Sequence, residues 1–173
     1  MSNSDPMNAP YKGMVAYPVR HFGWPEVACK HCGGFPERSM LQSFPFLLIA
    51  QIAFAVRAEI GRPLTVSSWY RCPLHPIEAR KPRPGVHQFA CAVDVLVNRW
   101  DVVHAINATC RVVQREGLID WEHLPKGSRC DEPTDILGIG IRQSGDMRTR
   151  FVHIDVAGLL PEFHPFRPGV WTY

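Results

Sequence analysis

The chain has 173 residues, of which 46% are hydrophobic and 20% charged, and its net charge is +3. This length suits one hydrophobic core and is short for two. Because the charge is only mildly basic and no dense run of lysine or arginine occurs, the composition argues against a nucleic-acid-binding protein.

Residues 1–20 are predicted to form an extended arm, followed by a single domain over residues 21–173. The first ten residues, MSNSDPMNAP, contain no apolar segment, so we expect no signal peptide and synthesis in the cytoplasm. The longest apolar run, residues 44–56, contains Pro45 and Gln51 and is too short to span a bilayer. We therefore expect no membrane partner.

The first strong helix is predicted over Phe44–Ile60, after a loop-rich segment at 21–36. Pro45 suits the first turn of a helix, and Gly61 supplies a stop signal. A helical period places three apolar residues on one face: Leu48, Ile52 and Val56. A strand at 64–67 and a loop at 69–86 with four prolines follow.

The second half of the chain predicts three strands and a helix. Residues 92–97 form an apolar strand, and Asn98 is placed to cap a helix that ends at Gly117. Leu137–Ile141 and Phe151–Val156 are predicted to pair as a hairpin around residues 144–145. This order favours an α+β domain with a small antiparallel sheet flanked by helices.

Two histidines and an aspartate suggest a metal site. His87 precedes the strand that contains Asp94, and His153 interrupts a second apolar strand. Such spacing also arises by chance, but a buried unpaired charge is costly, so these side chains are expected to meet at one ion. Two imidazoles and one carboxylate suit a catalytic zinc, with a fourth position left for water.

Asp155 follows His153 by two residues, so strand alternation places both side chains on one face of the sheet. Two roles are open to Asp155: the general base of a hydrolytic reaction, or a partner that orients a ligand imidazole. Of the two, the orienting or purely structural role ranks slightly higher, and among the candidate bases Asp155 is the first choice. Asp146, in the preceding turn, is the second choice for a base.

Six cysteines are many for a chain without a signal peptide, and free thiols or a metal site are expected rather than a disulfide framework. Cys29 and Cys32 have ligand spacing. A Cys-x-x-Cys redox protein would require a thioredoxin-like context, which the surrounding sequence lacks, and would leave Asp94 and His153 unexplained.

The segment Gly85-Val-His-Gln-Phe-Ala-Cys-Ala-Val-Asp94 resembles the Ser-x-His-x-x-Gly-x-Ala-x-Asp motif of the zinc D-Ala-D-Ala carboxypeptidases and L-alanyl-D-glutamate peptidases, which share the hedgehog/DD-peptidase fold. Val152-His-Ile-Asp155 resembles their second motif, and Ser68-Trp-Tyr-Arg71 lies where the family has Ser-Gly-Tyr-Arg. The similarity covers roughly residues 21–173 and is strongest to small phage and bacterial members.

The resemblance implies that zinc is held by His87, Asp94 and His153, and that Arg71 binds substrate and stabilises the transition state. It also implies a structural metal site or a disulfide among three cysteines: Cys29, Cys32 and Cys72.

Three positions depart from the family pattern. Gly85 replaces the motif serine and Ala90 the motif glycine. Arg150 occupies the position at which many members carry the catalytic carboxylate. The ligand set is unaffected by these changes, whereas the identity of the base does not carry over.

The expected function is that of a zinc metallopeptidase, which hydrolyses amide bonds of peptidoglycan stem peptides as a D-Ala-D-Ala carboxypeptidase or an L-Ala-D-Glu endopeptidase. By resemblance, it would act as an endolysin in cell-wall degradation by a phage or prophage, after holin-type release or as part of a particle. Because of Arg150, the alternative is a non-catalytic zinc-binding domain that serves as a binding or structural component of a virion or tail.

Overall fold

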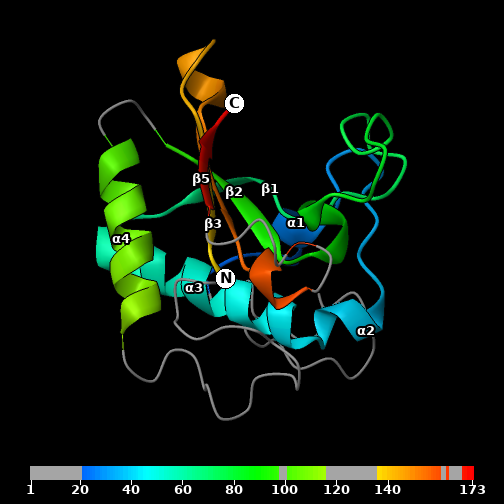
Figure 1. Cartoon of the computed structure of the whole chain (residues 1–173), viewed down its shortest axis with the longest axis horizontal. Helices are drawn as coiled ribbons and strands as arrows, with labels where there is room; N and C mark the ends of the chain where they lie inside the picture. Colours follow the sequence, from blue (N-terminus) through cyan, green and yellow to red (C-terminus); the bar gives the residue numbers. More distant parts are fainter. Residues whose placement is uncertain (1–20, 98–100, 116–135, 161–162, 164–168) are drawn as a thin grey trace.

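A computed structural model describes residues 21–97, 101–115, 136–160, 163 and 169–173. The predicted arm over residues 1–20 lies outside this part of the chain. The elements are arranged as in Figure 1 and occur in this order: α1 (Trp24–Val27), α2 (Arg38–Leu41), α3 (Phe44–Ile60), β1 (Thr65–Ser68), η2 (Val86–Phe89), β2 (Ala92–Leu96), α4 (Val102–Gln114), β3 (Gly138–Arg142), η5 (Met147–Thr149), β4 (Phe151–Asp155), η6 (Ala157–Leu159) and β5 (Gly169–Thr172).

Five strands form one sheet in the order β1-β2-β4-β3-β5. The first three pairings are antiparallel, including the predicted hairpin between β3 and β4. The expectation of a purely antiparallel sheet is wrong, because β5 pairs with β3 in parallel. The α+β class is confirmed.

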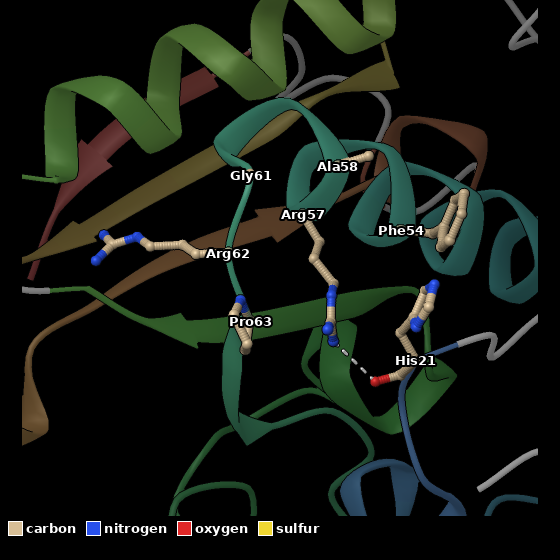
Figure 2. A pocket seen from close by; sticks show the side chains of 7 residues that line it. All are labelled: His21, Phe54, Arg57, Ala58, Gly61, Arg62 and Pro63. Carbon is tan, nitrogen blue, oxygen red and sulfur yellow. Dashed lines mark hydrogen bonds between the residues drawn. The ribbon is translucent and has the colours of Figure 1, made fainter. Parts of the chain in front are cut away.

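Helix α3 has the predicted bounds, and its ends show why. The Ser43 hydroxyl accepts a hydrogen bond from the Phe46 amide at 3.4 Å, and Gly61 closes the helix with φ of 74°. Near that end, Arg57 donates to the carbonyl oxygen of His21 at 3.1 Å, and the His21 ring stacks on Phe54 (Figure 2). The C-terminal half of α3 is thereby tied to the start of the described chain.

The second long helix, α4, begins at Val102 and ends at Gln114, so it is shorter than predicted. The expected cap Asn98 and stop Gly117 lie outside the described residues. Asp101 is the cap residue, and its carboxylate pairs with Arg62. None of the helices in the described chain has the length and apolar character needed to span a membrane.

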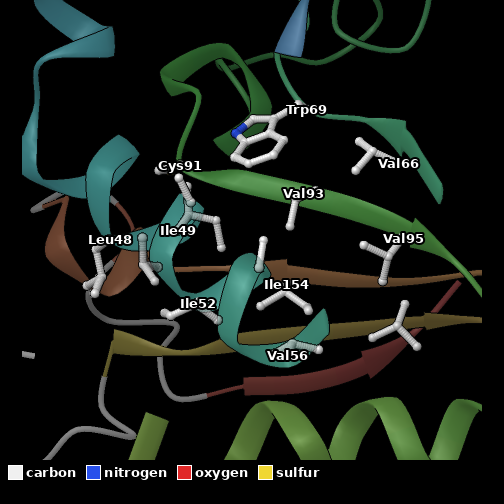
Figure 3. Close-up of a cluster of buried hydrophobic side chains, with 14 of the residues drawn as sticks. Leu48, Ile49, Ile52, Val56, Val66, Trp69, Cys91, Val93, Val95 and Ile154 are labelled. Atoms are coloured by element: carbon white, nitrogen blue, oxygen red, sulfur yellow. The ribbon is translucent and has the colours of Figure 1, made fainter. Parts of the chain in front are cut away.

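The core lies between the sheet and the two long helices. Figure 3 shows Ile49 and Ile52 of α3 facing Val93 of β2 and Ile154 of β4. All four side chains are fully buried, with Trp69 at one end of the cluster. Because side chains alternate along a strand, the residues between these valines and isoleucines point to the opposite face of the sheet.

That opposite face carries a row of polar and aromatic residues. Strand pairing aligns Ser68, Asp94, His153, Gly140 and Trp171 across all five strands. Gly140 leaves the space that Trp171 occupies: a Cβ atom there would lie 2.9 Å from the indole and 2.8 Å from the Tyr173 ring. The Trp171 ring consequently lies 5.4 Å from the His153 ring, between centroids.

Replacing Gly140 with alanine should destabilise the protein by about 1–3 kcal/mol, because the added methyl group overpacks against two aromatic rings. Urea denaturation followed by circular dichroism would measure this change. Val170→Ala is the control on the same edge of the sheet: Val170 is 69% exposed, so its loss should alter stability by no more than about 0.5 kcal/mol. Equal stability of Gly140→Ala and the parent would contradict the packing of Trp171 over Gly140.

Candidate metal centre

The three side chains expected to bind a metal are brought together. Asp94 and His153 are direct partners across β2 and β4, and His87 comes from η2, just before β2. All three are at most 2% exposed. One potential ligand atom from each lies within 4.8 Å of the other two.

The distances among these atoms fit a tetrahedral ion. With metal–ligand bonds near 2.0–2.1 Å, two ligands of zinc lie about 3.3 Å apart. His87 Nε2 lies 3.2 Å from His153 Nδ1 and 3.3 Å from Asp94 Oδ1. Asp94 Oδ1 and His153 Nδ1 are closer, at 2.7 Å, and would separate by about 0.6 Å to admit the ion. The three side chains therefore have the chemistry and the spacing to hold one tetrahedral metal ion.

The turn before β2 aims His87 at this point. Ala90, which replaces the motif glycine, has a left-handed backbone with φ of 55°. Its amide donates to the His87 carbonyl at 3.2 Å, and its own carbonyl accepts from Trp69 Nε1 at 3.3 Å. The left-handed conformation explains why glycine suits this position in the resembling family, and the bond to Trp69 holds alanine there despite the strain.

Each candidate ligand is hydrogen-bonded to a further group outside the ligand set. His87 Nδ1 donates to the Trp69 carbonyl at 2.6 Å, which leaves Nε2 for a metal. His153 Nε2 lies 3.1 Å from Asp155 Oδ2, and Asp94 Oδ2 accepts from Arg71. Such outer contacts fix the orientation of metal ligands and tune their basicity.

The charges of the group compensate one another. Burial lowers the pKa of His87. Burial also opposes the charge on His153, but hydrogen bonds to Asp155 and Asp94 outweigh it and raise the His153 pKa to about 9. For Asp94, burial is likewise outweighed, by the neighbouring imidazoles, and its pKa lies well below the usual range. Two carboxylates thus attract a cation at this point of the sheet, a role that a divalent metal ion would fill.

Asp155 lies on the far side of His153 from the ligand atoms. It is fully buried, and its second oxygen accepts from the Ala157 amide at 2.9 Å. Strand alternation was therefore a correct guide to its face, but Asp155 contacts His153 Nε2 and lines neither of the two cavities beside the group. This geometry favours an orienting role. Asp146, the second choice for a base, is exposed and pairs with Arg148 at 2.7 Å.

Arg71 connects the candidate metal ligands to Glu78, a buried carboxylate that the sequence analysis did not identify. Its Nε donates to the Ser68 hydroxyl at 2.8 Å, and its Nη1 lies 3.6 Å from Glu78. Glu78 is 2% exposed and accepts from the Gly85 amide at 3.1 Å. A Cβ atom at position 85 would clash with Lys81 Nζ and lie 2.5 Å from Glu78 Oε2, so the Glu78–Lys81 pair occupies the space that a side chain at position 85 would need.

The group opens into a basic pocket. A cavity of about 540 Å³ is lined by His87, His153, Trp171 and Tyr173, and a neighbouring one of about 280 Å³ reaches Asp94; Arg71 and Arg142 line both. Asp94 is the only carboxylate among the described residues that line the two cavities. The cations are Lys30, Arg71, Lys81, Arg142 and Arg148. Arg71, Lys81 and Arg148 are paired with Asp94, Glu78 and Asp146, so Lys30 and Arg142 supply the charge that an anionic ligand would meet there.

A second group of potential ligands lies outside this pocket. The sulfur atoms of Cys29, Cys32 and Cys72 lie within 4.8 Å of one another. Partial burial raises the pKa of Cys29, but backbone amides of Cys72, His31 and Cys32 outweigh this effect and bring its pKa below the ordinary value. The three thiols are free, and they lie close together, as either a shared metal site or a disulfide would require.

Comparisons of the chain with protein-family models, with curated proteins and with solved structures found no match. The assignment of this centre consequently depends on its own residues and on the motifs they form.

Substitution of His87 or His153 by alanine should abolish tight binding of one zinc ion, because two protein ligands cannot hold the ion as three do. Metal analysis after dialysis would measure the loss. His104→Ala is the matched control, since His104 is exposed on α4 and should leave the zinc content unchanged. Full zinc content in both ligand variants would place the site elsewhere.

Asp155→Asn should keep the fold and weaken zinc affinity by roughly 10- to 100-fold, as expected for loss of a group that orients a ligand. Competition with a chromophoric chelator would measure the affinity, with Asp146→Asn as the exposed control. Unchanged zinc affinity together with a roughly 10²- to 10⁴-fold loss of hydrolysis would instead identify Asp155 as the general base.

Proposed function

We propose that the chain is a zinc metallopeptidase of the hedgehog/DD-peptidase fold that hydrolyses amide bonds in peptidoglycan stem peptides. The observation that carries the proposal is the buried His87–Asp94–His153 group, whose ligand atoms lie at tetrahedral distances beside an open basic pocket. A zinc ion held there would lower the pKa of a water molecule and polarise the scissile carbonyl.

The protein's own residues have separate tasks in this proposal. His87, Asp94 and His153 hold the ion, while Trp69 and Asp155 fix the two imidazole rings. Arg71 is 9% exposed and lines the pocket while it is anchored to Asp94. Its guanidinium is therefore held in place to interact with an oxyanion that develops beside the ion.

The charge of the pocket supports the substrate class. Stem peptides carry free carboxylates, and Arg142 lines the same cavity as the metal group, where Lys81 is already paired with Glu78. Trp171, Tyr173 and Phe151 add apolar surface to the wall. An anionic peptide would find both charge complementarity and packing area there.

One observation favours a second candidate, a non-catalytic zinc-binding domain of a virion or tail. Apart from Asp94 itself, the described residues that line the two cavities include no carboxylate to serve as a general base. Arg150, at the usual position of the base, bonds instead to the Gly145 carbonyl at 3.3 Å. A binding role would need the pocket and the ion but no base.

Purified peptidoglycan should release peptide fragments when incubated with the zinc-loaded protein, and a chelator should stop the release. Arg71→Ala should lower kcat/KM by roughly 10²-fold, as for loss of an oxyanion donor, while saturating zinc keeps the site filled. Arg71→Lys should recover part of the activity, because an ammonium group lacks the guanidinium fork.

Mass analysis of the fragments would identify the bond that is cut, and His153→Ala provides the metal-deficient control. Binding to peptidoglycan without any cleavage would contradict the enzymatic proposal and support the binding domain. Full activity of Arg71→Ala would remove Arg71 from the mechanism.

A further inference from the structure

The three-cysteine group is built from two segments that are far apart in the sequence. Cys29 and Cys32 lie in the turn that follows α1, and Cys72 lies in the loop after β1. The turn is closed at both ends: the Gly33 amide donates to the Cys29 carbonyl at 2.8 Å, and the Cys29 amide donates to the Gly34 carbonyl at 2.9 Å. Gly33 has φ of 71°, so the turn requires a residue that tolerates the left-handed region.

Backbone amides are directed at the sulfur atoms. The Cys72 amide donates to Cys29 Sγ at 3.4 Å, and the Gly34 amide donates to Cys32 Sγ at 3.3 Å. These contacts fix the two sulfur atoms in place, and with Cys72 Sγ they form a set of three soft ligand atoms within 4.8 Å of one another, a spacing that one metal ion can bridge.

The number of converging sulfurs distinguishes a metal site from a disulfide. A disulfide would join two of the sulfurs and leave the third beside it without a role, whereas a metal ion uses all three. Soft thiolate ligands select zinc, copper(I) or iron–sulfur clusters, and Cys-x-x-Cys spacing is typical of structural zinc sites.

We propose that Cys29, Cys32 and Cys72 bind a second, structural zinc ion. Among the described residues only these three offer ligand atoms within 4.8 Å of one another at this place, so a solvent molecule would complete the four-coordinate shell of the ion.

A zinc ion at this point would fasten the loop that carries Arg71. The Tyr70 amide donates to the Val27 carbonyl, and the Arg71 amide to the His87 carbonyl, both at 3.2 Å. Cys72 is the next residue, so the ion would tie this short stretch to the turn at Cys29. The cysteine site would thereby position Arg71 against Asp94 without touching a substrate.

Metal analysis of protein purified under reducing conditions should give two zinc ions per chain. Cys32→Ser and Cys72→Ser should each lower the content to one, as should His87→Ala at the other site. Cys110→Ser is the matched control, because Cys110 lies on α4, outside the group, and should retain both ions.

Cobalt substitution separates the two sites by spectroscopy, independently of any hydrolysis. A sulfur-to-cobalt charge-transfer band should be present in His153→Ala and lost in Cys72→Ser, whatever the outcome with peptidoglycan. Should Cys72→Ser fail to fold, Cys32→Ser serves in its place, because Cys32 is exposed. Absence of the sulfur-to-cobalt band from His153→Ala, or a mass lowered by two hydrogen atoms that reflects a disulfide, would overturn the proposal.

Discussion

The charge of one buried carboxylate is the constraint on which the centre of this structure depends. Asp94 is 1% exposed in the middle of the sheet, and an uncompensated charge at such a place costs several kcal/mol. Its oxygens contact His87, His153 and Arg71. These three partners come from η2, from β4 and from the loop after β1, so the need to compensate one charge fixes three segments relative to one another.

The two faces of the sheet have different roles. Valine and isoleucine side chains on one face pack against α3 and α4, and the alternate positions on the other face hold the polar row. Gly140 permits the row to continue, because a larger residue would displace the aromatic side chains of the β5 edge. A shift of register by one residue would turn the polar row toward the helices and the valine and isoleucine side chains toward the pocket. The metal centre and the packing of the core therefore depend on the same strand register.

Local signals in the sequence were sufficient for some elements and insufficient for others. Helix α3 was predictable because its cap, its proline and its terminal glycine agree with its apolar face, and the metal group because charged residues interrupt apolar strands. Strand β5 was not predicted, because its four residues form a strand through their pairing with β3 rather than through a local sequence pattern. Glu78 was missed because a buried loop acid has no periodic signal. The face of Asp155 followed from alternation, but its position relative to the His153 ring depends on side-chain rotamers that no pattern encodes.

The sequence separations within the two ligand groups have a consequence for the order of events during folding. Asp94 and His153 lie 59 residues apart, so closing that loop requires β2 and β4 to pair, a non-local step that carries most of the entropic cost. Cys29 and Cys32 are close neighbours, and a nascent chain could present them together before any sheet exists. The third ligand, Cys72, lies 43 residues from Cys29, so completing the cysteine site also requires a non-local step, which closes a loop somewhat shorter than the one between Asp94 and His153.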